Sequence, residues 1–330
     1  MIRRQGASVV LGFAIAVSLL AVGAPQAAAT GDTDSCASAP SIRSLAPGGR
    51  IHVPARCLGA EARIAVGGHD VPVPQVGTGV GSHYLSVAEA DSSELVVENV
   101  DGVLAVSYDA VGAADPAAAV AAAASPSACS DNYSSWVGVR NNGWGYYLNT
   151  SVLPTGISGT TFQSEAQLAE GVLESGGNDC GLATGLSLFD IDITKLGGTT
   201  VPAAGTDGSC RQDSTDVIDF GYLPKSASGG QTLGHTCYWY TLLPFADDVI
   251  YAADVRLNKS SKWFSTIPSG CTGAYELEGV LVHEFGHVFG LTDIPEDTHG
   301  NLTMSAASTP CSYADHSWGR GDYNSLFAHY

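Results

Sequence analysis

Eight cysteines are the strongest constraint on what this chain can fold into. None of them belongs to a C-x₂-C pair, the spacing that is typical of zinc-binding cysteines. An even number of cysteines in an exported chain favours disulfides, each of which holds two distant segments side by side. We expect each cysteine to pair with its neighbour in sequence, which gives Cys36–Cys57, Cys129–Cys180, Cys210–Cys237 and Cys271–Cys311.

The N-terminus has the three parts of a secretory signal peptide. Arg3 and Arg4 precede an apolar run from Val9 to Val22, and small residues follow up to Ala29. The run is shorter than the roughly 20 residues that a membrane-spanning helix needs. We therefore expect residues 1–29 to be removed and the mature chain to be secreted to the extracellular space without a membrane attachment.

The charge of the chain excludes two classes of partner. Of its 330 residues, 33 are Asp or Glu and 14 are Lys or Arg, so the formal net charge is −19. Binding to nucleic acid or to anionic lipid requires clustered Lys and Arg. Because 45% of the residues are apolar, the chain has enough hydrophobic side chains for a folded core. We expect a globular monomer that binds neither nucleic acid nor a membrane.

Composition divides the mature chain into three parts. Residues 30–109 contain short alternating runs separated by Gly and Pro turns. This pattern predicts a β-rich N-terminal region, either a propeptide or an accessory module similar to immunoglobulin-like domains. Residues 110–128 are rich in Ala and Pro, which predicts a linker. Residues 129–330 form the third part and mix strand patterns with helix patterns.

Periodicity predicts the elements of the third part. Apolar residues recur with helical spacing at 162–173, 275–291 and 323–330, where we expect helices. Strands are expected where β-forming residues cluster or alternate, at 144–149, 186–193, 217–221, 237–243 and 249–257. The third part is therefore expected to contain both strands and helices.

The expected helix at 275–291 carries the residues of a metal site. His283 and His287 are four residues apart and therefore project from the same face of a helix. Two imidazoles in this arrangement can bind one Zn²⁺, and Glu284 lies beside them. The flanking residues are apolar, so we expect the helix to be buried, where His and Glu side chains need partners.

A catalytic zinc has three protein ligands and an open position for water, so a third ligand is needed. Gly290 allows the chain to turn sharply after the helix, and this turn can return Asp293 to the metal. His299 is the alternative third ligand. We prefer Asp293 because its spacing from His287 suits the turn.

The segment from His283 to Asp293, followed by Met304, resembles the H-E-x-x-H-x-x-G-x-x-(H/D) signature of the metzincin clan of zinc peptidases. Aspartate as the third ligand is similar to the snapalysins, whereas residues 251–258 and 318–323 are similar to matrixin-like bacterial peptidases. The resemblance covers residues 130–330 and implies that Met304 forms a hydrophobic base beneath the zinc. It also implies an α+β fold with a mixed five-stranded sheet, an active-site helix and a C-terminal helix. This domain would follow the small all-β N-terminal region that the alternating runs predict.

The function predicted from these residues is that of a secreted zinc metalloendopeptidase, which hydrolyses peptide bonds of extracellular proteins. In this function a zinc-bound water is the nucleophile, and Glu284 is first the general base and then the general acid. The resemblance implies a polypeptide substrate bound in extended form along an edge strand, for which we expect residues 237–243. Two alternatives stay open: an inactive peptidase-fold module for adhesion or binding, and a narrow-specificity processing peptidase acting on cell-wall peptides.

Other residues have simpler interpretations. Four aspartates offer ligands for a structural Ca²⁺, although solvation is the simpler role for each: Asp190, Asp192, Asp247 and Asp248. Cys57 lies in a P-A-R-C segment similar to the propeptide cysteine that blocks zinc in matrixins, and we prefer its disulfide with Cys36. The other histidines have no ligand spacing, and we expect them at the surface: His52, His69, His83, His235, His316 and His329.

Overall fold

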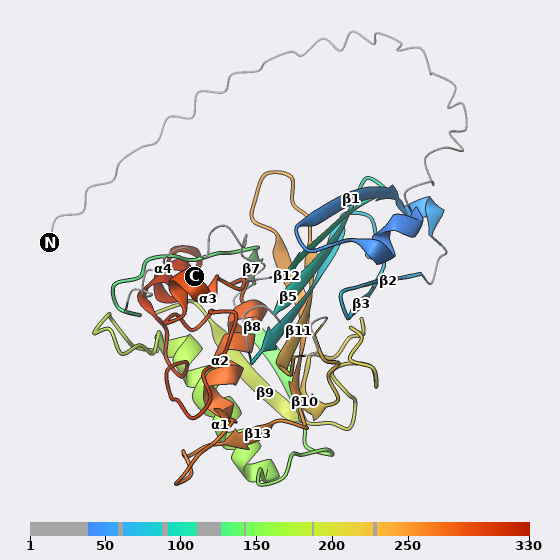
Figure 1. The fold of residues 1–330 in the computed structure, drawn as a ribbon. Helices are drawn as coiled ribbons and strands as arrows, with labels where there is room; N and C mark the ends of the chain where they lie inside the picture. The colour runs from blue at the N-terminus through green and yellow to red at the C-terminus, as the bar shows by residue number, and fades with distance from the viewer. Residues whose placement is uncertain are drawn as a thin grey trace, which may run out of the picture. The chain divides into compact units, whose positions relative to one another are not determined.

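The structure is a computed structural model, shown in Figure 1. It describes residues 39–58, 62–87, 92–110, 127–141, 143–186, 188–226 and 230–330. The predicted signal peptide, residues 1–29, and most of the predicted linker, residues 110–128, lie outside the described part of the chain. Among the described residues, none of the helices combines the length and the apolar character needed to span a membrane.

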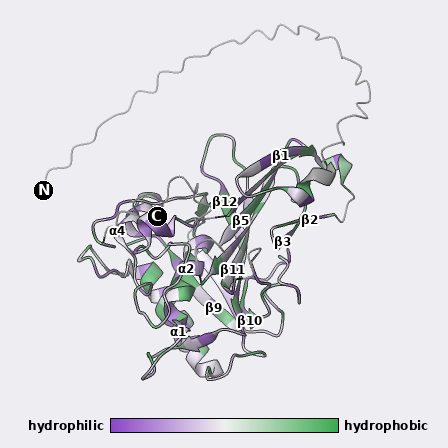
Figure 2. Cartoon of the chain, viewed as in Figure 1, coloured by the Kyte–Doolittle hydropathy of each residue, from purple (hydrophilic) through white to green (hydrophobic). Residues whose placement is uncertain are grey.

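The N-terminal region is built from strands, as its alternating runs predict. In β5, for example, every second side chain is buried, which is the pattern of a strand with one face on a core. Figure 2 shows the same interleaving of hydrophobic and hydrophilic residues along strands and helices. The elements are η2 (Ala39–Ser44), β1 (Gly49–Pro54), η3 (Ala55–Cys57), β2 (Arg63–Val66), β3 (His69–Pro72), β4 (Thr78–Ser86), β5 (Ser93–Val100) and β6 (Val103–Ala110).

The chain after the Ala-rich segment mixes strands with four helices in its described residues. Its strands are β7 (Val139–Arg140), β8 (Gly143–Asn149), β9 (Asp192–Gly198), β10 (Val217–Gly221), β11 (Thr232–Thr241), β12 (Val249–Asn258), β13 (Lys262–Phe264) and β14 (Ala274–Glu276). Its helices are α1 (Gly159–Ser175), α2 (Leu277–Val288), α3 (Glu296–His299) and α4 (Arg320–His329). The helices expected at 162–173, 275–291 and 323–330 are confirmed as α1, α2 and α4, whereas most of the strand expected at 186–193 is not extended.

Capping residues set the limits of α1. Ser158 is its N-cap, and the Ser158 hydroxyl accepts a hydrogen bond of 3.0 Å from the Thr161 N–H. Gly176 ends the helix with a φ of 64°, a left-handed conformation that glycine adopts without steric cost. The buried face follows the helical period and consists of Phe162, Glu165, Ala166, Ala169 and Leu173.

One mixed sheet of ten strands contains strands from both sides of the Ala-rich segment. Its order is β1-β6-β5-β4-β11-β12-β10-β8-β9, with β7 paired to β12. The pairs from β1 to β12 are antiparallel, and the pairs that join β12, β10, β8 and β9 are parallel. The two halves of the sheet meet where β4 pairs with β11, from Thr78 opposite Thr241 to Ser86 opposite Thr232.

The predicted fold class is wrong. We expected a five-stranded sheet in a separate α+β domain, and the described chain instead is mostly β, with a ten-stranded mixed sheet and few helices. The residues from Ser35 to Tyr330 form one compact unit. The physical reason is that an edge strand offers a row of unpaired backbone groups, and here β4 pairs with that edge of β11.

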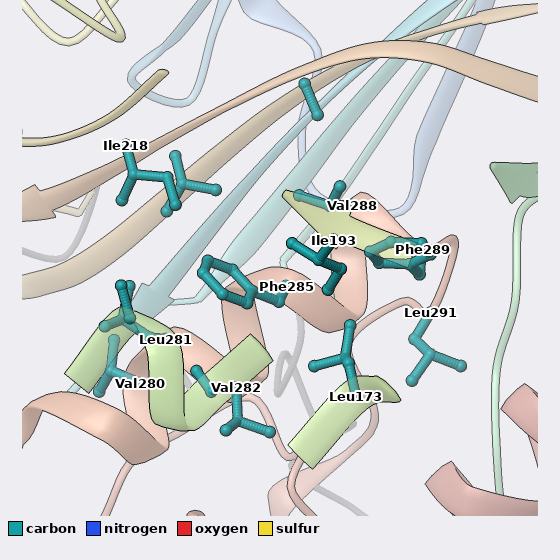
Figure 3. Close-up of a cluster of buried hydrophobic side chains, with 14 of the residues drawn as sticks. Leu173, Ile193, Ile218, Val280, Leu281, Val282, Phe285, Val288, Phe289 and Leu291 are labelled. Carbon is teal, nitrogen blue, oxygen red and sulfur yellow. The ribbon is translucent and has the colours of Figure 1, made fainter. Parts of the chain in front are cut away.

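The larger hydrophobic core lies between the helices and the sheet. Phe285 of α2 and Phe289, which follows the last residue of this helix, contact the ring of Trp144 of β8 edge to face. Figure 3 shows Leu173 of α1 and the apolar residues of α2 pointing into this core. A second core joins the N-terminal strands to Trp239 of β11. Both cores therefore meet at the strand that borders the candidate site.

Three of the four expected disulfides are confirmed: Cys129–Cys180, Cys210–Cys237 and Cys271–Cys311. Cys57 is also disulfide-bonded, and its expected partner Cys36 lies outside the described residues. The thiol of Cys57 is therefore not free to bind a metal. Disulfides of this number are typical of proteins that fold in an oxidising compartment.

Candidate metal centre

Helix α2 positions the two predicted histidine ligands. Nearly all of its side chains are buried, including both histidines and Glu284. The helix ends where Gly290 adopts a φ of 90°, and the Leu291 N–H donates a hydrogen bond of 2.9 Å to the Gly286 carbonyl. A Cβ at Gly290 would lie 1.7 Å from the Gly138 carbonyl oxygen, so only glycine fits this turn. The turn carries the chain back towards the histidines.

Three potential ligand atoms converge beside α2. The Nε2 atoms of His283 and His287 are 3.1 Å apart. The Oδ1 atom of Asp293 lies 3.2 Å from Nε2 of His283 and 3.3 Å from Nε2 of His287. Ligand atoms placed about 2.0–2.1 Å from a tetrahedral Zn²⁺ lie about 3.4 Å from one another. The three atoms therefore have the mutual distances of ligands that share one zinc ion.

Backbone carbonyls hold the two imidazoles in position. Nδ1 of His283 donates a hydrogen bond of 2.8 Å to the Thr303 carbonyl, and Nδ1 of His287 donates one of 2.9 Å to the Leu291 carbonyl. Because a carbonyl only accepts, the proton of each neutral ring lies on Nδ1 and the lone pair lies on Nε2. Metal-bound histidines in proteins are oriented in the same way.

The three potential ligands, His283, His287 and Asp293, are called the trio below. The carboxylate of Glu284 lies next to the trio, between α2 and β11. The Thr236 hydroxyl donates a hydrogen bond of 2.5 Å to Glu284 Oε2, whereas Oε1 is buried without a hydrogen bond. Burial raises the pKa of Glu284 to about 7, although the nearby charge of His283 and the Thr236 hydrogen bond act in the opposite direction. The chain therefore holds a buried carboxylate with one unpartnered oxygen at the site.

The pKa shifts within the trio show that the ionised Asp293 carboxylate favours a positive charge beside it. Burial alone would raise the pKa of Asp293, but the neighbouring His287 and His283 lower it well below its ordinary value. Burial alone would lower the pKa of His283, but the Asp293 carboxylate raises it to about 9. Both carboxylate oxygens of Asp293 are buried without a hydrogen bond. A bound cation would satisfy these oxygens and the two imidazole lone pairs together.

Met304 packs against α2 at Gly286. It is buried, and a Cβ built on Gly286 would lie 2.4 Å from the Met304 sulfur. Gly286 lies between the two histidines on α2, so the thioether fills the space that a larger residue would take. The Ile294 N–H donates a hydrogen bond of 3.0 Å to the Met304 carbonyl, which ties this turn to the segment after Asp293. The structure thus places Met304 beside Gly286, and its role as a base beneath a zinc ion stays a prediction.

His299, the alternative third ligand, lies elsewhere. Its Nδ1 atom is 2.7 Å from Asp131 Oδ2, and its ring stacks on Tyr133 with the centroids 4.0 Å apart. Asp293, in contrast, is in contact with both His283 and His287. The geometry therefore favours Asp293 over His299 as the third ligand.

The prediction that the remaining histidines lie at the surface is wrong for three of them. His69, His83 and His235 are buried, whereas His52 and His329 are exposed and His316 is half-buried. His83 reaches the candidate site, where its ring stacks on His287 with the centroids 4.2 Å apart. Sequence spacing gives no signal for this contact, because His83 belongs to β4 and meets α2 only through the pairing of β4 with β11.

Two other groups of candidate ligands do not form a comparable site. His235 lies 3.5 Å from the sulfur of Cys237, but Cys237 and Cys210 form a disulfide and offer no thiolate. In the described residues, the clusters of side chains able to hold a metal do not include the aspartates that we considered for Ca²⁺, which are Asp190, Asp192, Asp247 and Asp248.

The sequence was compared with models of protein families and with curated proteins. No model of a protein family matches the sequence, and no curated protein matches it either.

Proposed function

We propose that this chain is a secreted, zinc-dependent endopeptidase. The observation that carries the proposal is the convergence of His283, His287 and Asp293 at mutual distances of 3.1 to 3.3 Å, with the carboxylate of Glu284 beside them. Two imidazoles and one carboxylate are a ligand set typical of hydrolytic zinc sites. Zinc fits this set better than Mg²⁺ or Ca²⁺, which prefer oxygen ligands.

The residues of the chain divide the work of peptide hydrolysis between them. His283, His287 and Asp293 would hold a zinc ion, and the chemistry it would supply is that of a Lewis acid towards the scissile carbonyl and a water molecule. Glu284 accepts the proton at its unpartnered Oε1 and delivers it to the leaving amine. Thr236 holds the other oxygen of Glu284 and fixes the direction of the carboxylate. The carbonyls of Thr303 and Leu291 fix the ring orientations of the two histidines.

Secretion is part of the proposal. The N-terminal residues have the composition of a signal peptide, and the three disulfides fit a protein that folds outside the cytosol. We propose extracellular polypeptides as the substrates, bound in extended form beside β11. The side chain of Thr236 on this strand contacts Glu284, so a peptide paired with β11 would pass the carboxylate.

Metal content and proteolysis of the full chain test the proposed function. The chain and a Glu284→Gln variant are purified, and their zinc content and hydrolysis of casein are measured. Each preparation is assayed directly and again after brief trypsin treatment followed by a trypsin inhibitor, so that a masked site is also detected. We expect one zinc per chain in both proteins, and hydrolysis only by the chain with Glu284. A chelator should remove this activity, and added zinc should restore it.

Two results would contradict the proposal. Equal hydrolysis by the Glu284→Gln variant would exclude Glu284 as the general base. Zinc binding without hydrolysis of any protein or cell-wall peptide, in both the treated and the untreated chain, would favour an inactive binding module.

A further inference from the structure

Strand β4 of the N-terminal region lies along the edge of β11 that borders the candidate site. The two strands are antiparallel, with His83 opposite Thr236 and Leu85 opposite Gly234. The end of β4 is also held on its other side, because Ser86 forms a parallel bridge with Ala307 in the segment after Met304. The end of β4 therefore lies between β11 and this segment.

This arrangement closes the site. The side chains of His283, His287 and Asp293 are 2%, 0% and 1% exposed, and Glu284 is 0% exposed. A polypeptide cannot reach a carboxylate and a metal that are covered to this extent. The described structure is therefore a closed form of the site.

His83 points from β4 into the same cluster. Its Nδ1 atom lies 3.7 Å from Asp293 Oδ2 and is buried without a hydrogen bond. One ligand atom from each of His83, His287 and Asp293 lies within 4.8 Å of the other two. His83 thus adds a further nitrogen beside His287 and Asp293, the third imidazole of the candidate site after His283 and His287.

The second nitrogen of His83 is held as in the other two histidines. Nε2 of His83 lies 2.9 Å from the carboxylate oxygen Oε1 of Glu94, an acceptor that fixes the proton on Nε2 and leaves Nδ1 facing the site. His283 and His287 are held by backbone carbonyls through their own remote nitrogens. An oxygen partner on the remote nitrogen is the usual arrangement of a metal-bound histidine.

We propose that His83 is a fourth protein ligand of this metal site and that β4 occupies the strand position of a substrate, so that the N-terminal region holds the peptidase inactive. The inference rests on the proposed function for the nature of the blocked activity, but not for the coordination by His83. A fourth protein ligand fills the position that a catalytic zinc keeps open for water. Displacement of β4 frees this position and the backbone edge of β11 at once.

The edge of β11 that pairs with β4 belongs to the same strand that contacts Glu284. Thr236 and Gly234 of β11 both contact Glu284. They lie opposite His83 and Leu85 of β4. Any extended peptide that replaces β4 in this register carries its backbone past Glu284. The strand that blocks the site and the strand that would be hydrolysed therefore compete for the same hydrogen bonds.

Zinc X-ray absorption spectroscopy on the full chain tests the coordination. The wild-type chain should show three imidazoles and one carboxylate on zinc, and the His83→Ala variant should show two imidazoles, one carboxylate and a water. His52→Ala, in the exposed part of β1, is the matched control and should retain three imidazoles. A His83→Gln variant repeats the test if His83→Ala folds poorly. Two imidazoles in the wild-type chain would overturn the proposal.

Peptide hydrolysis by the same proteins tests the blockade. Activity follows the fraction of chain with an open site, so we expect His83→Ala to exceed the wild-type rate by about tenfold or more. His52→Ala should match the wild-type rate. A synthetic peptide with the sequence of residues 78–86 should inhibit His83→Ala, and the same peptide with Ala in place of His should inhibit it more weakly.

The two measurements separate the inference from the proposed function. Three imidazoles in the wild-type chain together with no hydrolysis by any variant would support the coordination by His83 and overturn the peptidase proposal. Two imidazoles in the wild-type chain together with equal hydrolysis by wild type and His83→Ala would overturn the inference and support the peptidase proposal.

Discussion

Gly234 of β11 lies so close to Glu284 of α2 that a Cβ at Gly234 would be 1.9 Å from the carboxylate oxygen Oε1. The missing side chain leaves the space in which this carboxylate sits. Thr236, two residues further along the same strand and on the same face, holds the other oxygen. The sequence of β11 is therefore matched to a glutamate on the neighbouring helix.

This contact predicts a specific coupling between the two residues. Gly234→Ala should destabilise the fold by about 1–3 kcal/mol, the usual cost of forcing an extra carbon into a packed interior. Glu284→Ala removes the clashing group, so the cost of Gly234→Ala should shrink in that background. Urea denaturation of the two single variants and the double variant measures the coupling. Additive effects would contradict the contact.

Gly171→Ala is the matched control for this prediction. Gly171 lies inside α1, and nothing lies within 4 Å of a Cβ built there. Alanine at this position should stabilise the chain by about 0.5–1 kcal/mol, because glycine is a poor helix former. This effect should be independent of Glu284.

The third ligand can be identified by zinc affinity. Asp293→Asn should weaken zinc binding by more than the 10–100-fold that loss of an outer-shell partner causes, because it removes a carboxylate from the ligand group itself. His299→Ala should leave the affinity unchanged, since His299 pairs with Asp131 instead. Competition with a chromophoric chelator gives both constants. A larger loss in His299→Ala than in Asp293→Asn would reverse the assignment.

Met304 should matter for stability through its shape. It is 1% exposed and fills the space beside Gly286, so Met304→Ala should destabilise the chain by about 2–5 kcal/mol. Met304→Leu keeps most of the volume and should cost less than about 1.5 kcal/mol. Leu186→Ala, at a side chain that is 79% exposed, should change the unfolding free energy little. Equal costs for Met304→Ala and Leu186→Ala would show that Met304 does not support α2.

Local patterns in the sequence carry the parts of the site that lie on one element. The spacing of His283 and His287 predicts one helical face, and the glycine after them predicts the turn that returns Asp293. Both features depend on neighbours a few residues apart. They can therefore be derived from periodicity and backbone preference alone.

The parts that depend on pairing between distant strands could not be predicted. Nothing in the alternation of β4 or β11 shows that the two strands pair, because every strand offers the same backbone groups. The merged sheet and the burial of His83 both follow from this one pairing. The sequence analysis therefore predicted neither the merged sheet nor the position of His83, because both depend on this pairing.

Asp322 of α4 is linked to His283 through the backbone of Thr303. The Thr303 N–H donates a hydrogen bond of 2.9 Å to Asp322 Oδ2, and the Thr303 carbonyl in turn accepts the hydrogen bond of His283. Burial raises the pKa of Asp322 to about 7, although the hydrogen bonds from backbone N–H groups, that of Thr303 first, act in the opposite direction. Between about pH 4 and pH 7, Asp322 is therefore protonated in the folded chain and ionised in the unfolded chain.

This difference predicts a pH dependence of stability with a definite sign. Between the ordinary pKa of 3.8 and the folded value of about 7, the folded state binds more protons than the unfolded state, so Asp322 makes the chain less stable as the pH rises. In Asp322→Asn this contribution is absent. The unfolding free energy of the variant relative to wild type should therefore increase by a few kcal/mol between about pH 4 and pH 7 and stay level above that. Urea denaturation across this range measures the trend, with Asp297→Asn at an exposed position of α3 as the control. A difference between Asp322→Asn and wild type that is constant across this range would show that Asp322 titrates alike in the folded and unfolded chain.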